Sequence, residues 1–156
     1  MNIRVVTKND VDDICKLVMS LSHYYLKDKE GELPVWFAAT LTRTEFLKRI
    51  ENIEFSNFLY ESQGSIIGYI AMKGNSHLYH LFVAEKEQGK GIARKLWQYV
   101  IGHCASDMYS LRSSLYAVPI YKKLGFVESD TVQEKEGIGF QPMELKQLNK
   151  KRNAEV

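Results

Sequence analysis

A glycine-containing stretch between a β-rich run and a helical pattern restricts the fold of this chain most. The run 77–84 leads into Gln88-Gly-Lys-Gly-Ile-Ala93, and apolar residues at helical spacing follow from Ile92 to Cys104. Glycines let a backbone approach a ligand without a Cβ in the way, and the first amides of a helix have no partners within the helix. The stretch therefore predicts an anion site at a helix N-terminus, suited to a phosphate or pyrophosphate.

Two other phosphate-binding loops fit this stretch poorly. The mononucleotide P-loop requires Gly-x4-Gly-Lys-Ser/Thr, which the sequence lacks. The dinucleotide fingerprint requires a third glycine where Arg94 stands. On the glycines alone, a tight strand-to-helix turn that binds nothing is an equally good interpretation.

The other hydrophobic patterns predict a mixed α/β fold. Thr7 with Asp10, and Thr42 with Glu45, have the spacing of helix capping boxes, and Gln63-Gly64-Ser65 has the composition of a hairpin turn. Residues 23–41 are rich in aromatic side chains and fit no element. We expect strands at 3–6, 55–61, 66–72, 77–84, 109–115, 126–132 and 139–145, and helices at 11–21, 42–53, 92–104 and 119–124. This order predicts a mixed sheet of about seven strands with helices on both faces.

Length and charge narrow the classes of protein. The 156 residues fit one domain over 1–147, followed by a polar C-terminal tail over 148–156. A net charge of +2 from 21 basic and 19 acidic residues favours no nucleic-acid partner. Without an apolar run of ~20 residues or a secretory pattern, we expect a cytoplasmic protein without membrane contact. Cys15 and Cys104 lie in helical patterns as buried thiols, and no Cys/His spacing predicts a metal site.

Three separate segments carry a resemblance to one family. Gln88, Gly91 and Ala93 fill the fixed positions of the acetyl-CoA pyrophosphate loop, Gln/Arg-x-x-Gly-x-Gly/Ala, of the GNAT N-acetyltransferases. The segment 117–126, Ala-Val-Pro-Ile-Tyr-Lys-Lys-Leu-Gly-Phe, resembles a later motif of the same family, and 136–143 is similar to the last strand of many bacterial members. The resemblance implies a GNAT-like fold whose sheet is splayed between its fourth and fifth strands.

The resemblance also implies where acetyl-CoA binds. Backbone amides of the loop would hold the pyrophosphate, and three residues of the preceding strand would pair with the pantetheine. Lys90 and Arg94 would add charge near the phosphates, although exposed charges at a helix start are an equally good interpretation. Ser114 stands where many relatives have an Asn that contacts the cofactor. The cofactor-binding residues expected are Leu81, Phe82, Val83, Gln88, Gly89, Lys90, Gly91, Ile92, Ala93 and Ser114.

Two residues are candidates for proton transfer. Tyr121 falls on the general-acid tyrosine of the family, where a phenol can donate to the departing thiolate; a core tyrosine is the other interpretation. His77 matches the position of a catalytic base in one branch, and a structural histidine is its alternative. His80, three residues later, is expected to face the opposite side of the sheet. The sequence shows no nucleophile in suitable context, which favours direct transfer.

The sequence does not identify the molecule that accepts the acetyl group. Aromatic and acidic residues in 23–41 suggest a pocket for an amine, with Tyr25, Glu32 and Trp36 as candidates, and simple packing of this segment is the alternative. We therefore expect an acetyl-CoA-dependent N-acetyltransferase that modifies a primary amine of a small molecule or peptide. A non-catalytic acyl-CoA-binding or regulatory module and a nucleotide- or RNA-binding domain are the rival functions. The oligomeric state, including a homodimer, stays open.

Overall fold

The computed structural model describes residues 2–21 and 35–147, with side chains described from residue 38 onward in the second range. The polar tail 148–156 and two of the expected acceptor residues, Tyr25 and Glu32, lie outside the described residues. Trp36 lies in a described helix, but its side chain is outside the described part.

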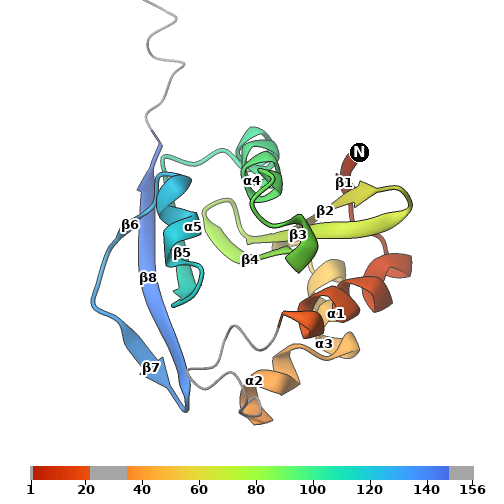
Figure 1. The fold of residues 1–156 in the computed structure, drawn as a ribbon, viewed down its shortest axis with the longest axis horizontal. Coiled ribbons are helices and arrows are strands. Elements are labelled where there is room, and N and C mark those ends of the chain that lie inside the picture. The colour runs from red at the N-terminus through yellow and green to blue at the C-terminus, as the bar shows by residue number, and fades with distance from the viewer. Residues whose placement is uncertain (1, 22–34, 148–156) are drawn as a thin grey trace, which may run out of the picture.

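Eight strands form one mixed sheet in the described part of the chain (Figure 1). Their order is β1-β2-β3-β4-β5-β8-β6, and β7 pairs with β8. β4 and β5 run parallel, and the other pairs are antiparallel. The strands are β1 (Asn2–Val5), β2 (Phe55–Ser62), β3 (Ser65–Lys73), β4 (His77–Val83), β5 (Met108–Ser114), β6 (Val127–Glu128), β7 (Gln133–Lys135) and β8 (Ile138–Lys146).

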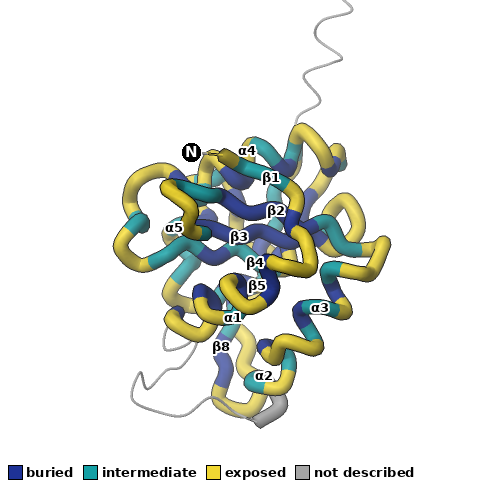
Figure 2. Tube along the Cα trace, turned by 90° about the vertical axis from the view of Figure 1, so that its right-hand side faces the viewer, coloured by how far each residue is buried: buried dark blue, intermediate teal, exposed yellow. Residues whose placement is uncertain are grey.

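Helices cover both faces of this sheet, which confirms the expected mixed α/β architecture. α4 (Ile92–His103) and α5 (Val118–Lys123) pack on one face, and α1 (Val11–Ser20) and α3 (Arg43–Glu51) pack on the other. The sequence did not predict α2 (Val35–Thr40), which precedes α3. The buried residues of β2 and β3 lie between these two helical layers (Figure 2). The sheet thus separates two hydrophobic cores.

The local signals in the sequence form the structures that they predicted. The Asp10 carboxylate accepts hydrogen bonds from the Thr7 amide at 2.7 Å and from the Thr7 hydroxyl at 3.1 Å, at the start of η1 (Lys8–Asp10) before α1. The hydroxyl of Thr42 accepts from the amide of Glu45 at the start of α3. Gln63 and Gly64 both have positive φ, the conformation that a tight two-residue hairpin requires, so the β2–β3 turn is confirmed.

The expected strand 126–132 is shorter in the structure. Only Val127–Glu128 pairs with β8 as β6, and pairing resumes at β7, which the sequence did not predict. Asp130 explains the interruption, because its carboxylate accepts from the amide of Thr131 at 2.7 Å and its carbonyl accepts from the Gln141 side chain. Such a local side-chain bond competes with ladder pairing and favours a turn.

Cysteines and acidic residues form no special site in the described part of the chain. Both cysteines are free thiols, and Cys104 is buried as expected, whereas Cys15 is only half-buried. Among the described residues, no three His, Cys, Asp or Glu side chains gather in a way that could hold a metal ion. None of the described helices is both long enough and apolar enough to cross a bilayer.

A bulge in β4 coincides with the point where β5 leaves it. Ala71 of β3 pairs with His80 and Met72 pairs with Leu78, so Tyr79 is an extra residue without a β3 partner. β5 pairs with β4 only at His77 and Leu78, and beyond them the two strands diverge. The expected splay between the fourth and fifth strands is therefore present, and its vertex lies at the bulge.

The bulge also overturns one expectation about β4. Leu78 packs on the α4 side, so His77, its neighbour, faces the α1 side. The ring of His80 packs against Phe46 and Phe82, which also lie on the α1 side. His77 and His80 thus share one face of the sheet. The prediction of opposite faces was wrong because the extra residue reverses the alternation.

His80 sits in an apolar and cationic environment that keeps it neutral. Burial, with a smaller contribution from the nearby charge of Arg49, lowers the pKa of His80 to about 3. Its Nε2 atom has no hydrogen-bond partner among the described residues and no contact with solvent. An unpartnered buried ring nitrogen reduces stability, and protonation would add to that cost.

We expect the free energy of unfolding to fall as the pH is lowered from 6.5 toward about 4, because the unfolded chain binds a proton at His80 that the folded chain does not. One such proton gives a slope of about 1.4 kcal/mol per pH unit. His77, whose pKa burial also lowers, acts in the same direction. Urea unfolding across this pH range measures the slope.

His80→Phe should reduce this slope and leave the contribution of His77, because phenylalanine keeps the aromatic packing and cannot titrate. A His80→Phe protein with the parent slope would contradict the assignment.

Candidate cofactor and active site

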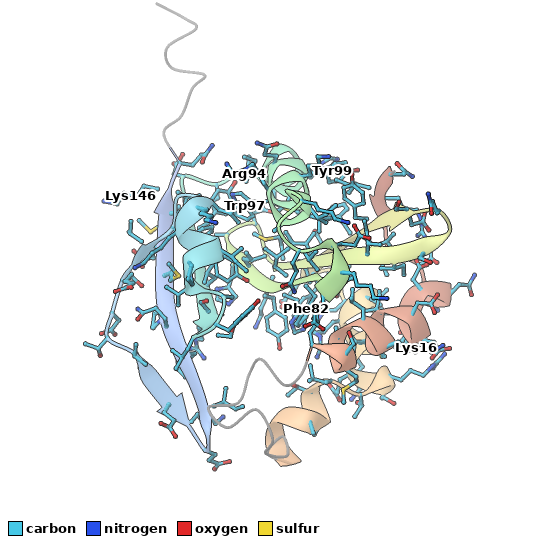
Figure 3. All side chains as sticks on the ribbon, viewed as in Figure 1. Lys16, Phe82, Arg94, Trp97, Tyr99 and Lys146 are labelled. Carbon is cyan, nitrogen blue, oxygen red and sulfur yellow. The ribbon has the colours of Figure 1, made fainter. Side chains whose placement is uncertain are left out.

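A cavity of about 280 Å³ opens where β4 and β5 diverge. Leu81, Phe82 and Val83 line it from β4, and Ser114 and Tyr121 line it from β5 and α5. Leu21, at the end of α1, reaches it from the other face of the sheet. Figure 3 shows Phe82 between the sheet and α1. The cavity therefore passes through the sheet and meets both helical layers.

The glycine loop forms one end of this cavity. Gly89 and Gly91 line it, both have a φ of 80°, and Gly91 is the N-cap of α4. A Cβ placed on either glycine would meet no protein atom within 4 Å, so the space beside the loop is open. The positive φ favours glycine at both positions. Any other residue there would also project its side chain into the open space beside the loop. The first amides of α4 are thus available to an anion.

The side chain of Gln88 ties the loop to the strand. Its Nε2 donates to the carbonyl of Val83 at 3.1 Å, and its Oε1 accepts from the hydroxyl of Tyr116 at 3.2 Å. Because Tyr116 follows β5, Gln88 joins the two sides of the splay. Gln88 therefore positions the loop with its side chain, in addition to the backbone role that was expected.

Most of the expected cofactor residues lie together in this cavity. Its lining includes Leu81, Phe82, Val83, Gln88, Gly89, Gly91, Ile92, Ala93 and Ser114. Lys90 does not line it: this side chain is exposed, and its Nζ lies 3.1 Å from the Glu87 carboxylate. Ser114 Oγ accepts from the amide of Ala117 at 3.2 Å, so it also stabilises the turn before α5.

Several lining residues were not predicted or were left open. Tyr116 lies in the turn before the Ala117 motif, and no pattern in the sequence distinguished it. Arg94, for which two interpretations were open, lines the cavity, and its Nη2 donates to the carbonyl of Lys123 at 3.0 Å. Lys123 also lines it, so two cations stand near the N-terminus of α4. Figure 3 labels Arg94 on α4.

Tyr121 faces the cavity from within the α4-side core. Only 8% of it is exposed, and its ring packs edge-on against Phe126 at 5.9 Å. Burial raises the pKa of its phenol, so the hydroxyl is protonated at neutral pH. No described residue provides a hydrogen-bond partner for this hydroxyl. Tyr121 therefore brings a protonated phenol to the lining of the cavity.

His77 lies at the vertex of the splay and does not line the cavity. Its Nδ1 is 2.9 Å from the hydroxyl of Ser110 on β5, which fixes the orientation of the ring. Burial, and then the positive charges of Arg112 and Lys73, lower the pKa of His77. The imidazole is therefore neutral at pH 7, which is the form that accepts a proton.

A family profile described as an acetyltransferase (GNAT) domain matches residues 25–147, most of the chain. The chain belongs to the GNAT family. The profile covers the glycine loop, the splayed strands and the segment around Tyr121.

Solved structures share this fold at low sequence identity. An N-acetyltransferase, PaiA, of Thermoplasma acidophilum in complex with coenzyme A has 18% identity and a TM-score of 0.71, with 94% of this chain and 98% of that chain covered. An aminoglycoside 6'-N-acetyltransferase complexed with coenzyme A has 15% identity and a TM-score of 0.69, covering 96% and 98%. A ribosomal-protein-alanine N-acetyltransferase of Brucella melitensis has 16% identity and a TM-score of 0.69, with 94% of this chain and 100% of that chain covered. No curated protein matches the sequence.

Gly91→Asn and Gly91→Asp form a matched pair that tests the anion site. Asn and Asp tolerate a positive φ better than other side chains, and the two differ only in charge. If the loop amides hold the CoA pyrophosphate, Gly91→Asp should bind CoA at least about tenfold more weakly than Gly91→Asn, because its carboxylate repels the phosphates. Titration calorimetry with CoA measures this. Equal affinity of the two variants, with both folded by circular dichroism, would contradict the assignment.

Proposed function

We propose that this GNAT protein is an acetyl-CoA-dependent N-acetyltransferase that passes the acetyl group directly to an amine. The observation that supports it best is the position of Tyr121, a buried phenol that faces the cavity whose other end is the glycine loop. A protein that only binds the cofactor needs the glycine loop and no proton donor. A proton donor beside the same cavity is useful to an enzyme, because it can protonate the thiolate that leaves. Two of the similar N-acetyltransferases were solved with coenzyme A, which also supports this donor.

The residues present fit acetyl-CoA along the whole cavity. The loop glycines leave open space at the N-terminus of α4 for a pyrophosphate. Beyond Leu78, the side of β4 that faces β5 has no strand partner in the described part of the chain, so its backbone groups are available to an amide-containing arm. The bound thioester supplies an activated acetyl group.

The proton transfers follow from the side chains at the other end. We assign Tyr121 as the general acid, which gives its phenolic proton to the sulfur that leaves when the acyl–sulfur bond breaks. We assign His77 as the base, held by Ser110, which receives the proton that the amine loses, directly or through water. Amides of β4 near the bulge can stabilise negative charge on the carbonyl oxygen. No covalent bond to the protein is needed.

The proposal is tested by measuring CoA thiol release with a broad panel of primary amines, including small molecules and peptides. Turnover with at least one amine supports an enzyme. Tight CoA binding without turnover on any amine of the panel would favour the rival, a non-catalytic acyl-CoA-binding module.

Tyr121→Phe should retain the fold and the affinity for acetyl-CoA but lower kcat by roughly 10²–10⁴-fold, because it removes the proton donor and keeps the ring. Steady-state kinetics and calorimetry on the same preparation separate the two effects. Tyr99→Phe, on the same side of the sheet but outside the cavity, is the matched control and should keep the parent kcat. A fully active Tyr121→Phe protein would reduce Tyr121 to a packing residue.

His77→Gln should lower kcat/KM most at mildly acidic pH. Because its pKa lies below the ordinary value, His77 stays neutral and able to accept a proton below pH 6.5, where few amines are deprotonated. Ser110→Ala should reproduce part of the loss, because the ring loses its hydrogen bond. The pH–rate profile is the measurement, and a His77→Gln profile parallel to that of the parent would assign the proton path to water.

A further inference from the structure

Arg49 carries a buried positive charge on the face of the sheet opposite α4. The residue is 8% exposed, and no described carboxylate lies within ion-pair distance of it. Its Nη2 donates to the carbonyl of Thr40 at 2.8 Å, whereas its Nε has no acceptor among the described residues and no contact with solvent. Buried charges are generally paired, so this guanidinium lacks the partner that its burial calls for.

Aromatic rings surround the guanidinium and compensate for part of this cost. The ring of Phe46 lies 4.6 Å from its central carbon and that of Tyr79 lies 5.5 Å away, distances typical of cation–π contacts. The Oδ1 atom of Asn57 accepts a hydrogen bond from the Tyr69 hydroxyl at 2.5 Å, so these two neighbouring polar groups are paired with each other. We refer to Phe46, Arg49, Asn57, Tyr69, Tyr79 and His80 as the Arg49 cluster.

Two hydrogen-bonding atoms of this cluster are left without partners. They are Nε of Arg49 and Nε2 of His80, and the charge of Arg49 is close enough to His80 to lower its pKa. Two such atoms in one cluster indicate a hydrogen-bonding group that the described residues do not supply. A negatively charged group that accepts hydrogen bonds would pair with the guanidinium. The neutral His80 can also donate a hydrogen bond to such a group, as the Nε2–H tautomer.

The cluster adjoins the end of the cavity where the acetyl group would react. The ring of His80 packs on Phe82 at 5.2 Å, and Phe82 lines the cavity. His77 lies on the same face of β4, and Tyr79 is the bulge residue at the vertex. Tyr79 is 38% exposed, and its ring packs on that of His80 at 4.5 Å and lies 5.5 Å from the Arg49 guanidinium, so the site proposed below requires this ring to move aside.

We propose that Arg49 binds a carboxylate of the acceptor, so that the acceptor is an amine bearing a carboxylate, of the amino-acid class. This inference rests on the proposed function. A guanidinium holds a carboxylate with two parallel hydrogen bonds, and Nε with a neighbouring Nη offers that geometry. With the carboxylate on Arg49, the proposal places the amine on the face of β4 that His77 shares with His80.

Other interpretations make different predictions. A buried water that bridges Nε and Nε2 would satisfy both atoms without any ligand. Arg49 would then serve only to join α3 to the carbonyl of Thr40 at the end of α2. In that case, removal of Arg49 would lower the stability of the protein and would affect the binding of all amines alike.

Binding is tested on the full chain saturated with CoA, so that no turnover is needed. The probes are a panel of L-amino acids and the matching amino-acid amides, which keep the amine and side chain but lack the carboxylate. We expect at least one free amino acid to shift the Nε–H resonance of Arg49 in arginine-labelled protein, and its amide to leave that resonance in place. No shift with any amino acid, or equal shifts with an acid and its amide, would overturn the proposal.

Arg49→Gln and Arg43→Gln provide the matched pair of variants. Arg43 is exposed on the same helix, where its Nε contacts Asp12. Its replacement therefore changes the net charge by the same amount at a different position. Arg49→Gln should weaken the binding of the free amino acid about 10- to 100-fold and leave its amide unaffected, and Arg43→Gln should leave both unaffected. Equal weakening of acid and amide in a folded Arg49→Gln protein would overturn the proposal.

If Arg49→Gln fails to fold, Arg49→Lys keeps the charge and removes the two-pronged geometry, and it should still bind the acid more weakly than the parent. Unchanged affinity in that variant would overturn the proposal. The two proposals fail separately. Turnover of amines that lack a carboxylate, together with no acid-specific binding, would keep the acetyltransferase and reject the Arg49 site, whereas no turnover on any amine would count against the acetyltransferase itself.

Discussion

The divergence of β4 from β5 is the constraint on which the rest of the site depends. A strand that loses its neighbour exposes backbone N–H and C=O groups, and buried groups of this kind need partners. Gln88 satisfies one of them through the carbonyl of Val83. The cavity lies at this divergence, and the glycine loop is close by in the chain, because only the short helix η3 (Glu85–Glu87) separates β4 from the loop and α4 starts where the loop ends. The bulge at Tyr79 sets where the divergence begins.

The sequence predicted the features that depend on neighbours a few residues apart. The caps at Thr7 and Thr42 and the turn at Gln63 are of this kind, and so is the turn into α4 at Gly91, where the backbone conformation itself selects glycine. The element order followed from hydrophobic period, because the two faces of the sheet are buried by different helices. The resemblance then supplied the position of the splay.

What the sequence did not predict depends on pairing between distant segments. The bulge exists because β3 pairs with β4 in two registers, on either side of Tyr79, and neither strand shows this in its own pattern. The wrong face for His80 follows directly from that omission. The bond between Tyr116 and Gln88 joins residues 28 positions apart, and the Arg49 cluster draws on α3, β2, β3 and β4. In each case the residue types are common, and only the fold brings them together.

The glycine loop and the proposed Arg49 site would recognise their ligands by different means, and this explains why the sequence pointed to the loop and did not point to Arg49. The loop end offers backbone amides, so few side chains are fixed there, and a short glycine motif is enough to find it. The proposed Arg49 site would use side chains, whose identities can change while the backbone stays the same. N-acetyltransferases named for different acceptors share this fold at 15–18% identity, as such a division would allow. A buried guanidinium without a carboxylate lowers stability, and at the proposed Arg49 site the carboxylate of an acceptor would offset that cost.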